Sequence, residues 1–239
     1  MEVVLSLAVS LAILALVIVG VVYAIQRLRH GEGVGLSLRQ ILVFYFYVMT
    51  VVTLLVTVSG LSRLVQAGLA LPLGKEFSYY PVYYPDSYPV IRAPVGVPPT
   101  PLATPTPAEP QKGPTADELA RERGLDQAFK EGILSGVMFT VVGGVFWLIH
   151  QGGRRRYGQN GGVLEQLYML SLLGIFAGMT LYSLPTGLYD TLRYYLLDVR
   201  EGFSPPGGRL ATAIIALPFW LFYLGAAFRK LRAGRATAS

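Results

Sequence analysis

The chain has 239 residues, of which 53% are hydrophobic and only 14% are charged, whereas an average globular chain carries about 25% charged residues. The charges are clustered, which leaves several windows of about 20 residues without any, enough to cross a bilayer. The composition therefore excludes an ordinary soluble protein and predicts an integral membrane protein. The chain has no cysteine and two histidines, which excludes disulfides, thiolate catalysis and thiolate metal sites.

Residues 3–25 form an unbroken apolar run that is long enough for a first membrane span. A secretory signal peptide would show positive charge before the run and a small-residue cleavage site after it. Here Glu2 precedes the run, and Arg27 and Arg29 follow it. The pattern favours a retained helix.

A second helix is predicted from residue 38, with an apolar stretch over residues 41–61. Its helical spacing continues to residue 71 across Arg63 and Gln66, so we expect the helix to project beyond the membrane. Thr50, Thr53 and Thr57 lie on this helix. Hydroxyl residues of this kind usually mark close packing between helices, although a polar path for a substrate is the alternative.

Residues 72–114 are rich in tyrosine and proline, and proline favours extended polyproline II structure over a packed core. The segment is either a spacer across the outer surface or a docking strap for a partner, and both interpretations stay open. As candidate partner-binding residues we take the tyrosines that stand among the first prolines of this segment: Tyr79, Tyr80, Tyr83, Tyr84 and Tyr88.

A capping box is predicted at Thr115, whose side chain and that of Glu118 would each bond the other residue's backbone amide. The charged helix expected over 117–131 leads into a third span over 132–150. Four glycines of this span should let a neighbouring helix approach closely, two of them in a GxxxG motif: Gly132, Gly136, Gly143 and Gly144.

A fourth span is predicted from residue 163 to Pro185, where the proline should kink or break the helix. Residues 187–199 resume an amphipathic pattern, either on the membrane surface or as a helical extension. After a turn over 204–208, a fifth span covers 210–228, with Pro218 inside it, and a basic tail follows.

The charges predict an orientation. Residues 26–39, 151–163 and 229–239 carry ten cations against Glu32 and Glu165, while the other side has ten cations and twelve acids. Positive residues in short loops stay cytoplasmic. We therefore expect a five-span helical bundle in a bacterial cytoplasmic membrane, with an external N-terminus and a cytoplasmic C-terminus. The segments 72–131 and 200–209 would be external.

An internal duplication is also indicated. Phe146-Trp147-Leu148, followed by arginines, parallels Phe219-Trp220-Leu221, followed by basic residues, and Gly60-Leu61 parallels Gly187-Leu188. The pattern predicts a first membrane unit over 1–71, the external segment 72–131 and a second membrane unit over 132–239. Residues 145–199, with the arginines in the turn, are expected to form a helical hairpin within the second unit.

On these residues, the chain resembles a bacterial family of unknown function that is built from repeated two-helix membrane units. The resemblance covers roughly residues 132–230 and, more loosely, 38–70, and the tyrosine- and proline-rich insertion departs from it. It implies the architecture and no activity or site residue.

Ionisable residues within spans usually mark transport or proton transfer, and the apolar cores predicted here contain none. The sequence shows no Ser/His/Asp set, HExxH motif, Walker loop or GxGxxG motif. We therefore expect a protein that is not an enzyme. A small-solute channel or transporter stays an alternative, although the predicted spans lack the polar residues expected of one. His30 and His150 lie at the predicted cytoplasmic ends of two spans and could ligate a haem or a chlorophyll-type pigment, although histidine is also a routine interfacial residue.

The function predicted from the sequence is that of an accessory or scaffolding subunit of a larger membrane assembly. An electron-transfer or light-harvesting subunit with a haem or pigment is the alternative; otherwise no cofactor or metal is expected. The expected partners are the lipid bilayer and other membrane subunits, and not nucleic acid. Arg154, Arg155 and Arg156 are expected to fix the topology first and to contact lipid second.

Overall fold

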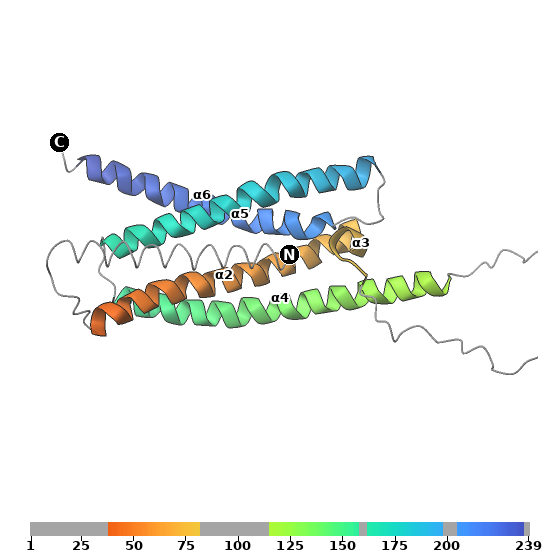
Figure 1. Ribbon diagram of the computed structural model, residues 1–239, viewed down its shortest axis with the longest axis horizontal. Coiled ribbons are helices and arrows are strands. Elements are labelled where there is room, and N and C mark those ends of the chain that lie inside the picture. Colours follow the sequence, from red (N-terminus) through yellow and green to blue (C-terminus); the bar gives the residue numbers. More distant parts are fainter. Residues whose placement is uncertain (1–37, 82–114, 158–161, 198–204, 237–239) are drawn as a thin grey trace, which may run out of the picture.

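The computed structural model describes residues 38–81, 115–157, 162–197 and 205–236 (Figure 1). Its helices, in chain order, are α2 (Leu38–Leu73), α3 (Lys75–Ser78), α4 (Ala116–Tyr157), α5 (Val163–Leu196) and α6 (Pro206–Ala236). All of these except α3 are long and apolar enough to cross a membrane. An all-helical fold with long apolar helices is thus confirmed. The first predicted span, residues 3–25, lies outside the described residues.

The long helices are arranged as two pairs, with α2 along α4 and α5 along α6, and α2 also contacts α6 and joins the pairs (Figure 1). The helices α4 and α5 follow one another in the chain but barely touch within the described part. The two helices predicted within residues 145–199 are present, but they pack mainly against α2 and α6 instead of against each other. A short connection makes two helices antiparallel, but their faces decide which helices pack together.

Close approaches of the backbones explain the pairing of α2 with α4. A Cβ added to Gly60 would lie 2.4 Å from the Thr140 backbone nitrogen, and one added to Gly143 would lie 2.8 Å from that of Thr57. Gly136 is equally close to Leu64, whereas the nearest atom to Gly144 would be 4.0 Å away. The prediction of close approach is confirmed for Gly136 and Gly143, whereas a Cβ at Gly144 would make only an ordinary van der Waals contact with Thr57.

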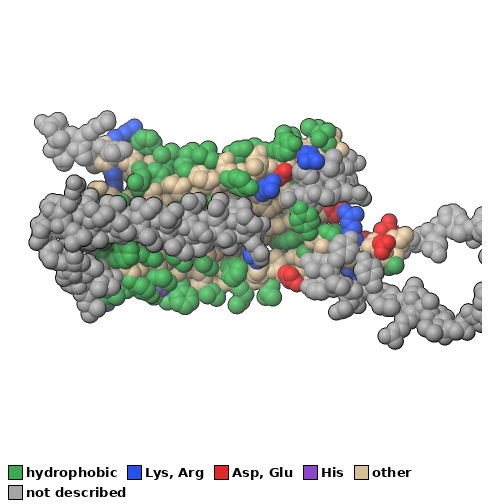
Figure 2. Space-filling view, in the orientation of Figure 1, with side chains coloured by type: hydrophobic (Ala, Val, Ile, Leu, Met, Phe, Trp, Pro, Cys, Tyr) green, Lys and Arg blue, Asp and Glu red, His purple; other side chains and the backbone are tan. Residues whose placement is uncertain are grey.

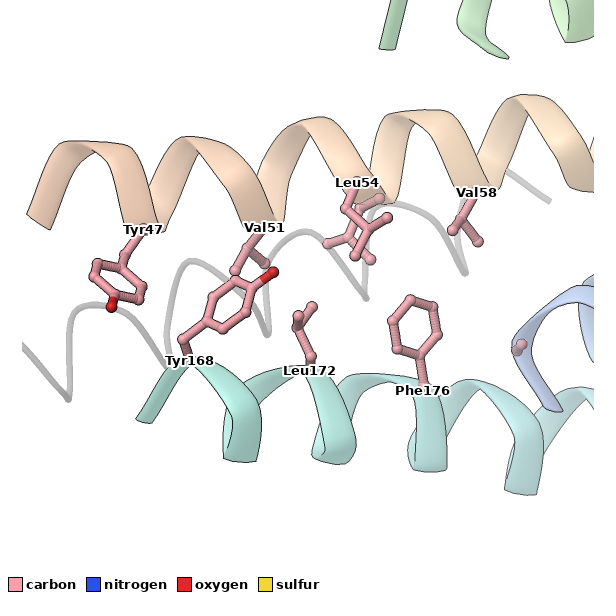
Figure 3. Packing of buried hydrophobic residues seen from close by; sticks show 9 residues of the cluster. Tyr47, Val51, Leu54, Val58, Tyr168, Leu172 and Phe176 are labelled. Carbon is pink, nitrogen blue, oxygen red and sulfur yellow. The ribbon is translucent and has the colours of Figure 1, made fainter. Parts of the chain in front are cut away.

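The core lies between α2 and α5, which run in the same direction. Tyr47, Val51, Leu54 and Val58 of α2 face Leu172 and Phe176 of α5 (Figure 3). These α2 residues are three or four positions apart, so they share one face of the helix. Further contributions come from α6 and α4: Ala216, Phe219 and Trp147 pack against this cluster.

Hydroxyl groups along α2 bond their own helix. The Thr50, Thr53 and Thr57 hydroxyls donate to carbonyl oxygens four residues earlier, at 2.6, 2.6 and 2.8 Å. Thr57 also lies against Gly143 of α4. Thr57 therefore serves the close contact between helices, as the packing interpretation predicted, and Thr50 and Thr53 are buried.

The ends of the helices decide several other predictions. The helix α2 runs to Leu73, which confirms its extension past Arg63, and α5 continues as a helix to Leu196. A break at Pro185 is therefore wrong. Proline is tolerated within apolar helices where hydroxyls support neighbouring carbonyl groups, and Ser183 and Thr186 donate to the carbonyl oxygens of Met179 and Tyr182, at 2.5 and 2.6 Å.

Candidate functional site

A short helix, α3, closes the end of the bundle where α4 begins. Gly74 adopts φ +92° and turns the chain away from α2, a conformation that favours glycine. Phe77 of α3 is fully buried and meets the Tyr194 ring edge-on, with 5.5 Å between the ring centroids. Gln66 donates to the Ser78 carbonyl oxygen at 2.5 Å. The packing of α3 between α2 and α5 was not predicted from the sequence. The glycine directly after a long helix is the signal that could have indicated a turn there.

Tyr79 continues from α3 onto α4. Its ring meets the Phe129 ring edge-on at 6.0 Å between centroids, and a Cβ added to Gly132 would lie 2.4 Å from its hydroxyl oxygen. Glycine at 132 therefore makes room for this tyrosine. Burial raises the pKa of the Tyr79 hydroxyl above its usual range, and the nearby Arg63 cation opposes that shift. The Tyr79 ring is thus held against its own chain.

Arg63, which the sequence analysis placed beyond the membrane core, lies in the contact between α2 and α4. It donates to the Ser135 hydroxyl at 2.8 Å, and its guanidinium carbon lies 5.0 Å from the centre of the Phe139 ring. A cation held by a hydroxyl and an aromatic face fixes the register of the two helices at this depth.

The beginning of α4 is fixed to α3 by charge. Lys75 pairs with Asp126, and Arg121 pairs with Glu76 at 3.3 Å. The predicted capping box is confirmed: the Thr115 amide donates to the Glu118 carboxylate at 2.7 Å, and the Glu118 amide donates to the Thr115 hydroxyl at 3.3 Å. Both ends of the segment 82–114 are therefore attached to one structure, which we call the platform: α3, Tyr79 and residues 115–132.

The candidate partner-binding tyrosines do not form one group. Tyr79 faces α4, whereas Tyr80 is 53% exposed. The other three, Tyr83, Tyr84 and Tyr88, lie outside the described residues.

A buried ion pair joins α5 to α6 at the same end of the bundle. Asp190 is only 3% exposed and accepts from Arg209, whose side chain is about one-third exposed. This pair was not predicted from the sequence, because Arg209 follows a turn and could face either side of its helix. A buried carboxylate needs such a partner, so this pair fixes α5 to α6.

Cations dominate the opposite end, where α4 and α6 finish. Arg155 and Arg156 are exposed, but Arg154 turns inward, with its guanidinium carbon 4.2 Å from the centre of the Tyr168 ring and 5.5 Å from that of Tyr47. Glu165 accepts from Lys230 at 2.8 Å. The three arginines of the turn are therefore not equivalent.

His150 lies near this end and is 7% exposed. Its Nδ1 is 2.7 Å from the Phe146 carbonyl oxygen, and its Nε2 is 3.2 Å from the Tyr45 hydroxyl. Because a carbonyl can only accept, Nδ1 carries a proton, and Nε2 faces the Tyr45 hydroxyl. An axial bond to a haem or pigment would have to replace that hydrogen bond. His30 lies outside the described residues, and within those described no three His, Asp or Glu side chains gather as a metal site. The cofactor alternative stays a prediction that an absorption spectrum of the pure protein tests.

No protein-family model matches the chain, and no curated protein or solved structure shows significant similarity to it. The resemblance to a family of two-helix membrane units therefore stays a prediction, and the function has to be argued from the two ends of the bundle.

Proposed function

We propose that this protein is a non-catalytic accessory or scaffolding subunit of a larger membrane assembly, and that it binds its partner at the platform. The observation that carries the proposal is the attachment of the tyrosine- and proline-rich segment 82–114 at both ends. Tyr79 lies against Phe129 and Gly132 at one end of the segment, and Thr115 caps α4 at the other. A segment attached in this way can bind with a smaller loss of entropy than a free tail.

The platform itself offers a charged surface beside that segment. Residues 117–123 of α4 are mostly exposed, with acids and arginines interspersed, and Tyr80 is exposed at the start of the segment. Figure 2 shows acidic side chains gathered at this end of the molecule, next to basic ones. Aromatic side chains within a polar rim are a composition typical of binding surfaces.

The proposed topology has five spans, with the N-terminus outside and the C-terminus inside a bacterial cytoplasmic membrane, so that the platform is external. Its support is the distribution of charge: cations at the end with Arg154–Arg156 outnumber acids, whereas acids and cations are mixed at the platform. Along the bundle, α4 exposes a long apolar face, with Leu134, Leu148 and Ile149 each about 60% exposed or more, which suits contact with lipid or with another membrane subunit.

The test is photo-crosslinking in native membranes. A photoreactive phenylalanine at Tyr83 should give a discrete adduct with a partner subunit, because this tyrosine lies in the proposed docking segment. The matched control is the same substitution at Tyr189, a tyrosine of α5 that is 61% exposed and lies outside that segment. Adducts from Tyr189 and none from Tyr83 would contradict the docking role of the segment.

Substitution of Tyr79 adds a second measurement. Tyr79→Ala removes the ring from Phe129 and should lower the amount of co-purified partner about threefold to tenfold, which corresponds to about 1 kcal/mol of lost pre-organisation. Tyr79→Phe keeps the ring and removes only a buried hydroxyl that has no hydrogen-bond partner in the described structure, so it should leave the partner bound. A protein that purifies cleanly alone from gently solubilised membranes would contradict the proposal as a whole.

A further inference from the structure

Four polar side chains on one face of α4 have a buried atom without a hydrogen-bond partner in the described structure: Thr140 Oγ1, Trp147 Nε1, Gln151 Oε1 and Arg154 Nε. Thr140 lies against Gly60 of α2, and the other three lie nearer the end of α4. Because they are four and three residues apart, they line up along the helix. We call this line the polar seam. Buried polar groups in folded proteins almost always have a partner, and those that lack one often mark a bound water, ion or ligand.

Arg154 is held in place at the end of this seam. Its guanidinium lies near the rings of Tyr168 and Tyr47, which themselves meet edge-on at 5.6 Å between centroids (Figure 3 shows these two tyrosines). The acid nearest to it in the chain, Glu165, accepts from Lys230. The guanidinium is therefore oriented by aromatic faces, and its Nε has no acceptor in the described structure.

The depth of the seam fits a lipid headgroup. Arg154 lies three residues before the end of α4, and Trp147 lies about 10 Å further along the helix axis, at 1.5 Å per residue. In the proposed topology, on which this inference rests, this range covers the boundary between headgroups and acyl chains. A quarter of a turn round the helix from the seam, α4 exposes Val137, Val141 and Leu148, which are 45%, 57% and 63% exposed. That apolar strip would accommodate acyl chains.

We propose that the polar seam binds the headgroup of an anionic phospholipid that also carries hydroxyl groups, as phosphatidylglycerol does. The phosphodiester oxygens accept from the Arg154 guanidinium, a deeper ester oxygen accepts from the Trp147 indole, and a headgroup hydroxyl donates to the Gln151 carbonyl oxygen. Each of the three unpartnered atoms thereby gains a complementary group. The apolar strip beside the seam favours a lipid over free phosphate.

The test uses the full chain in detergent and in nanodiscs. The melting temperature and the number of retained lipids, from native mass spectrometry, are measured with phosphatidylglycerol, with phosphatidylcholine and with inorganic phosphate. Phosphatidylglycerol should stabilise the wild type and remain bound after delipidation, and the other two should not. Arg154→Lys keeps the charge but loses Nε and the planar fork, so it should weaken retention at least tenfold. The matched control, Arg156→Lys, changes an exposed arginine two residues away and should retain the lipid.

A second variant covers the case in which Arg154→Lys does not fold. Trp147→Phe keeps a six-membered aromatic ring but removes the indole N–H together with the fused five-membered ring, and it should weaken lipid retention without abolishing it. Equal retention of the lipid by Arg154→Lys and Arg156→Lys, which both keep the charge, would show diffuse attraction of charge and overturn the proposal. Binding of inorganic phosphate with the same dependence on Arg154 would overturn the proposal of a lipid ligand and indicate that the site binds a soluble anion.

Discussion

At the platform end of the bundle, cations meet carboxylates, as in Lys75 with Asp126 and Arg209 with Asp190. At the opposite end, Glu165 is the one acid in the described part, and cations meet aromatic rings instead, as Arg154 meets Tyr168. The first arrangement is neutralised within the protein, so it can keep its shape in any surroundings. The second leaves a net positive charge at one face, which anionic lipid or the membrane potential can act on. The comparison separates a docking end from an orienting end.

The largest effect should follow from removing charge at the orienting end. Replacing Arg154, Arg155 and Arg156 together with Gln removes attraction to anionic lipid that is worth about 1 kcal/mol per residue near the surface, so about 3 kcal/mol in total. We expect a mixed population in which a cysteine placed at Gly158 becomes partly accessible to impermeant reagent from outside intact cells. In the wild-type background the same cysteine should not react. Uniform insertion of the triple variant together with loss of a bound partner would instead identify the turn as a docking site.

The buried ion pair at the platform end gives the next largest effect. Asp190→Ala leaves the Arg209 cation without its carboxylate, and losing one partner of a buried pair costs about 3–5 kcal/mol. Because Arg209 is about one-third exposed and can turn toward solvent, we expect a loss of about 2 kcal/mol in the free energy of unfolding, measured by thermal unfolding in detergent. Glu122→Ala removes an exposed carboxylate from the same end and should change little. A similar loss in both variants would mean that net charge, and not the pair, stabilises this end.

Local signals in the sequence were sufficient for the helices and the capping box, because both depend on neighbouring residues. Thr115 and Glu118 are three residues apart, and the helical period past Arg63 is visible in the chain itself. The faces that pack together were not predictable in this way. Nothing local distinguishes Gly143, where an added Cβ would lie 2.8 Å from the Thr57 backbone nitrogen, from Gly144, where it would make only an ordinary van der Waals contact with Thr57. The pairing of α2 with α4 and not of α4 with α5 is a non-local choice.

The same limit applies to the candidate site. The three arginines of the turn look alike in the sequence, and only the positions of Tyr47 and Tyr168 make Arg154 different. Tyr79 reads like the other tyrosines of its segment, but the absence of a side chain at Gly132 gives it a place on α4. Both distinctions depend on residues more than ten positions away, which no period or motif connects.

The smallest effect should come from the exposed ion pair of the platform, and its salt dependence sharpens the comparison of the two ends. Lys75 and Asp126 are about 40–50% exposed, and an exposed pair contributes about 0.2–1 kcal/mol, which salt screens within about 10 Å at 0.1 M. Lys75 also lies 5.6 Å from the centre of the Phe129 ring, so Lys75→Met, which keeps most of the apolar stem, removes the charge with little loss of packing. We expect a loss of about 0.5 kcal/mol in the free energy of unfolding at low salt and almost none at 1 M salt. For Asp190→Ala the loss should persist at 1 M salt, because that carboxylate is buried away from mobile ions. If the two variants lose their effects in parallel as salt rises, Asp190 is solvated, and the platform end is then held by screened surface charge.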